Sequence, residues 1–156
     1  MTKLLYIFSL LFVFVSCKTQ KSAIADNINE KTQLVIEYSQ TAGYGNNPEY
    51  EIQLFSNRQM YLTAKKNLDK QGKYMRTLSE KEYNQVINAF KGADFFSFKD
   101  EYTGNITDLP VRYLYFNYNG KEKKIKDYYN TPPELKELEY MIQSFLDRVG
   151  WEKLKW

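Results

Sequence analysis

The stretch VRYLYFNYNGKEKKIKDYY, residues 111–129, decides the fold. Two segments with the residue content of strands, 111–118 and 121–129, lie on either side of Asn119-Gly120. Asn-Gly between two such segments is the strongest short-range signal for a β-hairpin, because both turn positions require a positive φ angle. The stretch therefore predicts two antiparallel strands, and the rest of the chain is interpreted outward from them.

Four more strands are predicted upstream of this hairpin. Apolar and polar residues alternate in 33–39, most clearly in 49–54, and again in 60–64, and a shorter strand is expected at 73–78. A period of two places one side of each strand in a core. Ser56-Asn57 supplies the turn between the second and third of these strands.

A helix is predicted between the two groups of strands. Ser79 and Glu82 have the spacing of a capping box, in which each side chain bonds the backbone N–H of the other residue. Apolar residues follow at the spacing of one helical face, and Gly92 stands where the helix should end.

A second helix is predicted after the hairpin. Thr131 and Glu134 have the same capping-box spacing, and Pro132 stands in the first turn, where a proline is tolerated. The helix is expected to run to Gly150 with an apolar face that consists of Leu135, Leu138, Met141, Ile142, Phe145 and Val149.

These elements predict one α+β domain over residues 33–156. The order is ββββαββα, and we expect a single antiparallel sheet of about six strands with both helices packed on one face. No internal repeat and no further domain boundary is visible in this part of the sequence.

The N-terminus resembles a bacterial lipoprotein signal. One positive charge precedes an apolar run, 4–15, that is shorter than the ~20 residues a spanning helix needs. A small residue then precedes Cys17, the only cysteine. We expect a signal peptide at 1–16, a lipidated Cys17 and a flexible tether over 17–32, which would anchor the protein in a bacterial membrane, the outer one, facing the periplasm or the surface. An ordinary secretory signal or an uncleaved anchor is the alternative.

Composition excludes several classes of protein. The chain has no histidine and one cysteine, which excludes catalysis by imidazole, His-ligated metal sites, four-thiolate metal sites and an intramolecular disulfide. We therefore expect no cofactor and no metal. A net charge of +3 gives no argument for nucleic acid as a partner.

Several motifs resemble a known bacterial family, and together they cover about residues 33–151. The motifs are FKGADFFSFKDEY at 90–102, TDLP at 107–110, NGK at 119–121, KDYY at 126–129 and LKELE at 135–139.

The family that these motifs resemble is domain of unknown function family 6438, which is common in cell-envelope lipoproteins. The resemblance implies a fold and a location but no activity. Its members typically place two cysteines around a Gly-x-Cys-Pro-x-Tyr element, where this chain has Gly43 and Asn47. Because both cysteines are absent together, we infer that this chain has lost a disulfide of the loop and not a catalytic thiol.

Five carboxylates are the acid–base groups that remain for an enzyme: Asp94, Asp100, Glu101, Asp108 and Asp127. Two of them could serve glycoside hydrolysis, and a group of them could bind Ca²⁺. Alternatively, Asp108 caps the turn before the next strand, and Asp100 pairs with a lysine or bonds backbone amides. We favour these structural roles, with Asp100 and Asp108 as the first suspects if the protein is an enzyme.

The basic run 121–126 has three interpretations. It could contact nucleic acid, or anionic lipid headgroups. It could also be a solvent-facing strand that lysines protect against edge pairing, and this is the interpretation we favour.

Aromatic content of 17% is the strongest positive signal for function. Tyr113, Tyr115 and Tyr118 fall on both faces of one predicted strand, whereas Tyr44 and Tyr128 fall at turns or strand ends. Exposed tyrosines offer a large apolar area with a polar tip, which suits contacts with sugars or proteins. Near the C-terminus we expect Trp151 to dock on the sheet and make no assignment for Trp156.

The sequence thus predicts a lipid-anchored, non-catalytic binding module for an envelope protein or glycan. The five tyrosines named above are the candidate binding surface, and the loop 43–48 is a second candidate. The alternatives are a carboxylate-dependent hydrolase and a periplasmic inhibitor that inserts a loop into an active site. No oligomeric state is indicated.

Overall fold

The computed structural model describes residues 32–155. The predicted signal peptide, Cys17, the predicted tether up to residue 31, and Trp156 lie outside the described residues. The strands are β1 (Leu34–Gln40), β2 (Glu49–Phe55), β3 (Gln59–Lys66), β4 (Gly72–Thr77), β5 (Glu101–Tyr102), β6 (Arg112–Tyr118), β7 (Lys121–Asp127) and β8 (Glu152–Lys153). The helices are α1 (Glu80–Gly92), the 3₁₀ helix η1 (Phe95–Ser97) and α2 (Pro133–Gln143).

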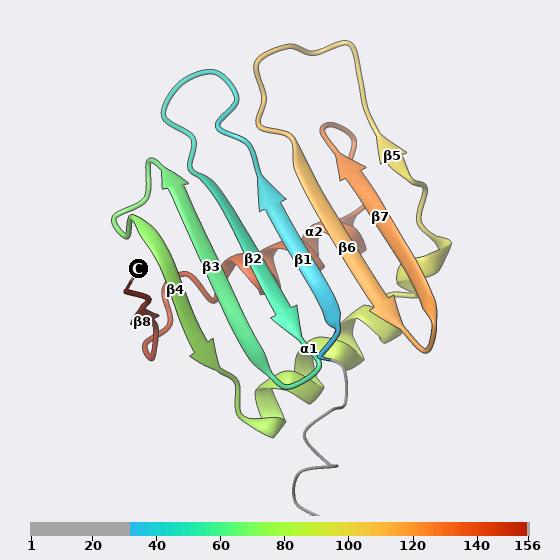
Figure 1. The fold of residues 1–156 in the computed structure, drawn as a ribbon. Helices are drawn as coiled ribbons and strands as arrows, with labels where there is room; N and C mark the ends of the chain where they lie inside the picture. The colour runs from blue at the N-terminus through green and yellow to red at the C-terminus, as the bar shows by residue number, and fades with distance from the viewer. Residues whose placement is uncertain (1–31, 156) are drawn as a thin grey trace, which may run out of the picture. The chain divides into compact units, whose positions relative to one another are not determined.

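The eight strands form one sheet in the order β5-β7-β6-β1-β2-β3-β4-β8 (Figure 1). The predicted hairpin lies within it as β6 and β7, with Tyr118 opposite Lys121. Asn119 and Gly120 have φ angles of 51° and 75°, which confirms the turn that the Asn-Gly pair predicts. The α+β class is confirmed.

The predicted strand count and the purely antiparallel sheet are wrong. The two additional strands, β5 and β8, have two residues each, and β5 pairs with β7 in parallel. Strands this short show no alternation in sequence, and backbone bonds to a neighbouring strand define them. One such bond joins the N–H of Tyr128 to the carbonyl of Tyr102, and another joins the N–H of Leu154 to the carbonyl of Lys73.

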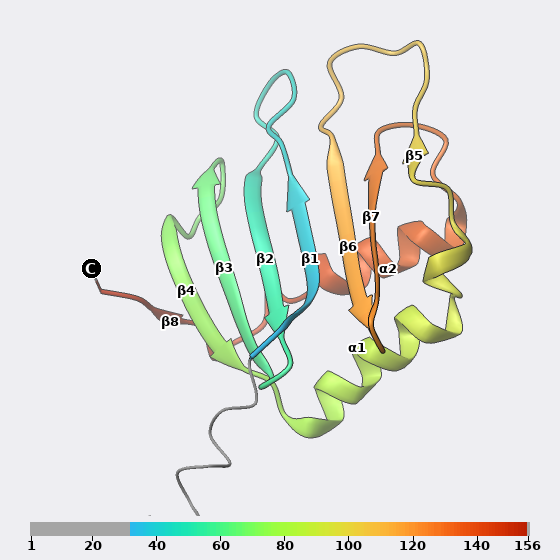
Figure 2. The same ribbon diagram turned by 45° about the vertical axis from the view of Figure 1, so that its right-hand side comes forward.

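Both helices lie on the same face of the sheet, as predicted (Figures 1 and 2). The alternation in the strands directs one set of apolar side chains toward the helices, where they are buried. The core residues from β1, β2, β3 and β6 that face the helices are Ile36, Tyr38, Tyr50, Ile52, Leu54, Met60, Leu62, Ala64, Leu114 and Phe116. Those from the helices are Val86, Ile87, Phe90, Leu135, Leu138 and Ile142. None of the helices within residues 32–155 is long and apolar enough to cross a membrane.

The first capping box is confirmed and the second is wrong. Ser79 Oγ accepts the N–H of Glu82 at 3.2 Å, and Glu82 Oε2 accepts the N–H of Ser79 at 2.9 Å. Helix α2 instead has Pro132 at its N-cap, with no side-chain cap. The hydroxyl of Thr131 donates to Oδ1 of Asp127 at 2.6 Å, so it bonds the end of β7 instead of the N-terminus of the helix.

Helix α2 ends at Gln143 and not at Gly150 as predicted. Turns follow, and within them Phe145 is buried whereas Val149 is 90% exposed. The chain bends because Trp151 packs against the core, as expected, and its Nε1 donates to the carbonyl of Phe145 at 2.8 Å. This bond lies between residues six apart, which a continuous helix would separate along its axis.

Candidate functional site

The face of the sheet opposite the helices carries no covering element within residues 32–155 (Figure 2). We call it the open face. It consists of the side chains that alternate with the core residues, so the same period of two that builds the core also builds this surface. Its members on β1 to β4, β6 and β7 include Glu37, Glu51, Gln53, Phe55, Gln59, Tyr61, Thr63, Lys73, Met75, Tyr113, Tyr115, Glu122 and Lys124.

One half of the open face is an ionic network around Glu37. Its two carboxylate oxygens accept from Lys124 Nζ and from Gln53 Nε2, each at 3.0 Å. Burial raises the pKa of Glu37, but these two bonds outweigh burial and hold the pKa below its usual value. The ammonium of Lys124 also lies 5.4 Å from the ring centre of Tyr113, so the ring and the network are held together.

A second pair extends this network toward the β6–β7 turn. The hydroxyl of Tyr115 donates to Oε2 of Glu122 at 2.8 Å. Partial burial and this carboxylate both raise the pKa of Tyr115, so its hydroxyl stays protonated and available as a polar tip.

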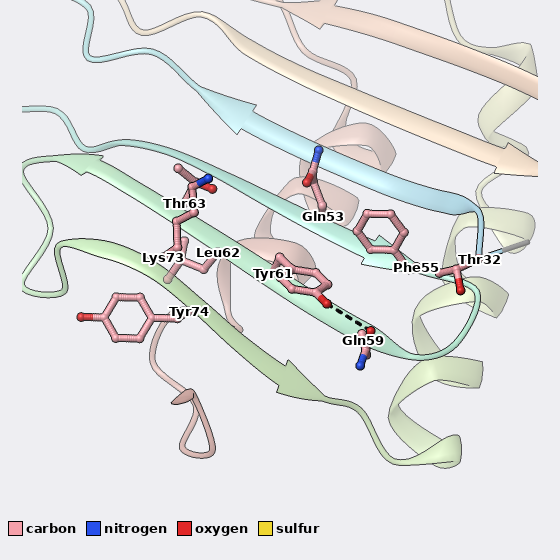
Figure 3. A pocket seen from close by; sticks show the side chains of 9 residues that line it. All are labelled: Thr32, Gln53, Phe55, Gln59, Tyr61, Leu62, Thr63, Lys73 and Tyr74. Atoms are coloured by element: carbon pink, nitrogen blue, oxygen red, sulfur yellow. Dashed lines mark hydrogen bonds between the residues drawn. The ribbon is translucent and has the colours of Figure 1, made fainter. Parts of the chain in front are cut away.

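The other half of the open face holds a pocket of about 280 Å³ (Figure 3). The rings of Phe55 and Tyr61 meet edge to face in it, with centroids 5.5 Å apart and planes at 85°. The hydroxyl of Tyr61 donates to Oε1 of Gln59 at 3.1 Å, which is the dashed line in Figure 3. The lining residues are Thr32, Gln53, Phe55, Gln59, Tyr61, Leu62, Thr63, Lys73 and Tyr74.

A charged cluster lies on the opposite, helix-covered side of the sheet. Arg112 Nε is 2.9 Å from Oδ2 of Asp127 and 3.3 Å from Oε2 of Glu139, and both carboxyl groups are 1% exposed. Arg112 and Asp127 stand opposite each other in the β6–β7 hairpin, and α2 supplies Glu139. We call Asp127 and Glu139 the buried carboxyl pair.

The buried carboxyl pair has one guanidinium for two acids. Burial raises the pKa of Glu139 to about 8; Arg112 opposes this rise and the charge of Asp127 adds to it. Neither oxygen of Glu139 has a hydrogen-bond partner among the described residues. The raised pKa favours the neutral acid form of Glu139, which avoids one uncompensated negative charge in a dry site.

Two buried tyrosines border this cluster. The rings of Tyr38 and Tyr50 lie 5.7 Å apart, and Gln143 Nε2 donates to the hydroxyl of Tyr38 at 2.5 Å. Burial raises the pKa of Tyr50 to about 12 and that of Tyr38 further, so both stay neutral.

The five tyrosines predicted as a binding surface do not lie together. Tyr113 and Tyr115 share the open face, whereas Tyr118 lies on the helix side, stacked on Phe116 with ring centres 5.8 Å apart. Tyr44 is 81% exposed in the β1–β2 loop.

Tyr128 follows the last residue of β7, and its N–H donates to the backbone of β5. The loop 43–48, the second candidate surface, packs on the loop before β6. The N–H of Tyr44 there donates to the carbonyl of Asp108 at 3.1 Å.

Three of the predicted surface carboxylates have a side-chain partner. Asp100 pairs with Lys123 at 2.9 Å, and Glu101 pairs with Lys126 at 2.6 Å. Asp108 has a φ angle of 76° and accepts from Thr107.

Asp94 stands before η1 with a φ angle of 48°. Across residues 32–155, no three Asp, Glu, Cys or His side chains are grouped so that they could hold a metal ion.

Sequence reasoning missed Arg112, Glu139 and the Phe55–Tyr61 pair. The predicted hairpin could have indicated Arg112, because a turn at Asn119-Gly120 places Arg112 opposite Asp127. Glu139 stood out as an acid four residues after Leu135, on the apolar face of the helix.

No curated protein matches the chain. The family model described as a domain of unknown function, DUF6438, matches residues 34–146. The match extends from β1 to just beyond α2 and so includes the open face and the buried carboxyl pair. The chain belongs to the DUF6438 family.

Proposed function

We propose that this protein is a lipid-anchored module of the bacterial cell envelope that binds an envelope glycan on its open face and catalyses no reaction. One observation carries the proposal. The open face interleaves the half-buried rings of Tyr61, Tyr113 and Tyr115 with amide, hydroxyl and carboxylate side chains across neighbouring strands.

This chemistry matches a sugar chain better than a protein surface. A sugar presents C–H faces that pack on rings, and hydroxyls that pair with amides and carboxylates. The cores of protein–protein interfaces are instead depleted of Lys and Glu. On the open face Glu37 and Lys124 lie between the rings, where a protein partner would have to cover a charged network.

The position of the buried carboxyl pair supports binding without catalysis. Glycoside hydrolysis needs two carboxyls that flank the scissile bond about 5 to 9.5 Å apart, where substrate and water reach both. Asp127 and Glu139 are each 1% exposed and share Arg112. A pair in this position holds β6, β7 and α2 together and is not accessible to a substrate.

The anchor gives the module its location. Lipidation at Cys17 would bind the chain to a membrane through acyl chains, at about 0.8 kcal/mol per buried CH₂. A flexible tether over 17–32 would reach on the order of 20 Å, enough for the domain to meet a surface-bound polymer.

A capture experiment from native envelope tests the proposed function. The full chain is compared with a variant that removes three open-face rings, Tyr61→Ala, Tyr113→Ala and Tyr115→Ala. The matched control is Tyr140→Ala, which removes a tyrosine that is 59% exposed on α2.

We expect the wild type and the control to retain envelope glycan and the triple variant to lose it. Capture of a protein in place of a glycan would contradict the proposal, and so would glycan retention by the triple variant.

A further inference from the structure

The pocket on the open face has the size of a subsite for one ring. Its volume of about 280 Å³ lies just below the range of small-molecule pockets, which span ~300–1,000 Å³. It therefore fits one ring-sized group and not an extended segment of a ligand. It lies beside the β2–β3 turn, between Phe55 and Tyr61 at its walls (Figure 3).

The two rings form a corner that accepts an apolar face. Because Phe55 and Tyr61 meet at 85°, the edge of one ring contacts the face of the other and their outer surfaces stay open to the pocket. Both side chains are half-buried, so the strands fix their positions before any ligand arrives.

Polar groups surround this corner, and hydrogen bonds within the protein fix the orientation of the Gln59 amide. Gln59 Oε1 accepts from Tyr61 Oη at 3.1 Å and from Asn57 Nδ2 at 2.8 Å, which turns its amide nitrogen outward as a donor. Gln59 and Thr63 both line the pocket, and the donor that remains on Gln59 is its amide nitrogen, Nε2. They are the groups that would receive ligand hydroxyls.

The pocket is also continuous with the rest of the open face. Gln53 lines the pocket and donates to Glu37, the centre of the ionic network. A chain that leaves the pocket across β2 would therefore meet Glu37 and then the rings of β6.

We propose that the Phe55–Tyr61 pocket is the anchoring subsite for one neutral pyranose ring of the glycan, with the sugar's C–H face on the ring of Tyr61 and its hydroxyls on Gln59 and Thr63. This inference rests on the proposed function, because it names the part of the open face that holds the glycan.

Calorimetric titration of the full chain tests the subsite with four neutral tetrasaccharides: maltotetraose, cellotetraose, mannotetraose and chitotetraose. We expect at least one to bind, and Tyr61→Ala to weaken that binding by about tenfold or more, which corresponds to loss of one stacked ring. Tyr61→Phe keeps the ring and should retain most of the affinity. Gln59→Ala should lower the affinity although the ring of Tyr61 is kept.

The outcomes separate this inference from the proposed function. Loss of binding in Tyr113→Ala/Tyr115→Ala with no change in Tyr61→Ala would overturn the subsite and leave glycan binding by the open face intact. Failure of all four tetrasaccharides would also overturn the subsite. Failure of the envelope capture would overturn the proposed function as well. Circular dichroism of each variant shows that the fold is kept, and Tyr140→Ala should bind as the wild type does.

Discussion

Arg112 donates from Nε to Oδ2 of Asp127 at 2.9 Å, across two strands that the Asn119-Gly120 turn brings together. Glu139 approaches the same nitrogen from α2 at 3.3 Å. One guanidinium thus joins β6, β7 and α2 inside the domain. We propose that the open face binds the ligand and that the buried carboxyl pair holds the helix layer to the sheet.

The first prediction concerns the pH dependence of stability. The pKa of Glu139 is raised from 4.5 to about 8 in the folded protein. Between these values the folded state holds a proton that the unfolded state has lost, so the free energy of unfolding falls as pH rises through this window and levels off above it. Glu139→Gln removes this titration and should gain stability relative to the wild type by a few kcal/mol as pH rises from about 5 to about 9.

Urea unfolding of both proteins across this range measures the effect. The difference between the two proteins isolates Glu139, because the other titrating groups are common to both. Parallel pH profiles would show that Glu139 is charged in the folded state at neutral pH.

Removal of Arg112 should be strongly destabilising. Arg112→Met leaves the buried carboxyl pair without its cation, and loss of one partner from a buried ion pair costs about 3–5 kcal/mol. The matched control is Lys124→Met, which removes the more exposed partner of a pair with Glu37 and should cost less than about 1 kcal/mol. Equal losses in urea unfolding would mean that the cluster does not hold the helix layer.

The sequence predicts those parts of the fold that short-range chemistry determines. Asn119-Gly120 specifies its own turn, and Ser79 with Glu82 caps α1 within one turn of helix. Competing partners determine parts that it does not predict. Thr131 has the spacing of a capping box, but its hydroxyl bonds Asp127, the last residue of β7, four positions earlier.

In the candidate site, too, the sequence predicts on which face a side chain lies but not which distant residue it meets. The alternation in β2 and β3 predicts that Tyr61 leaves the core, but only the pairing of these strands brings its ring to Phe55. Similarly, helical spacing places Glu139 on the buried face of α2, whereas Arg112, which makes that position tolerable, comes from a distant strand.

The packing of the loop 43–48 predicts an order for two glycine substitutions. Gly43 has a φ angle of 59°, and a Cβ there would lie 2.7 Å from the backbone nitrogen of Pro110. Gly45 has a φ angle of 100° with nothing within 4 Å of such a Cβ. Both alanine variants carry backbone strain of about 1–2 kcal/mol, but Gly43→Ala also pushes the two loops apart and should be the less stable of the pair.

Thermal unfolding of the two glycine variants compares them directly. If Gly45→Ala proved the less stable variant, backbone strain alone would govern the loop, and its packing on Pro110 would contribute little.

The lipid anchor is tested at Cys17. Cys17→Ser removes the thiol that lipidation requires, so we expect loss of lipid labelling and release of the protein from the membrane fraction. Tyr140→Ala, with an intact Cys17, serves as the control and should stay in the membrane fraction. Continued membrane retention of Cys17→Ser would contradict the lipoprotein assignment.

The central claim, that the open face binds an envelope glycan, is tested most directly by NMR titration of the full chain with a purified envelope polysaccharide fraction. The account predicts shift changes that are confined to the strands β1 to β4, β6 and β7, largest at Phe55 and Tyr61, with the resonances of α1 and α2 unchanged. Shift changes centred on the helices, or none at saturating polysaccharide, would contradict it.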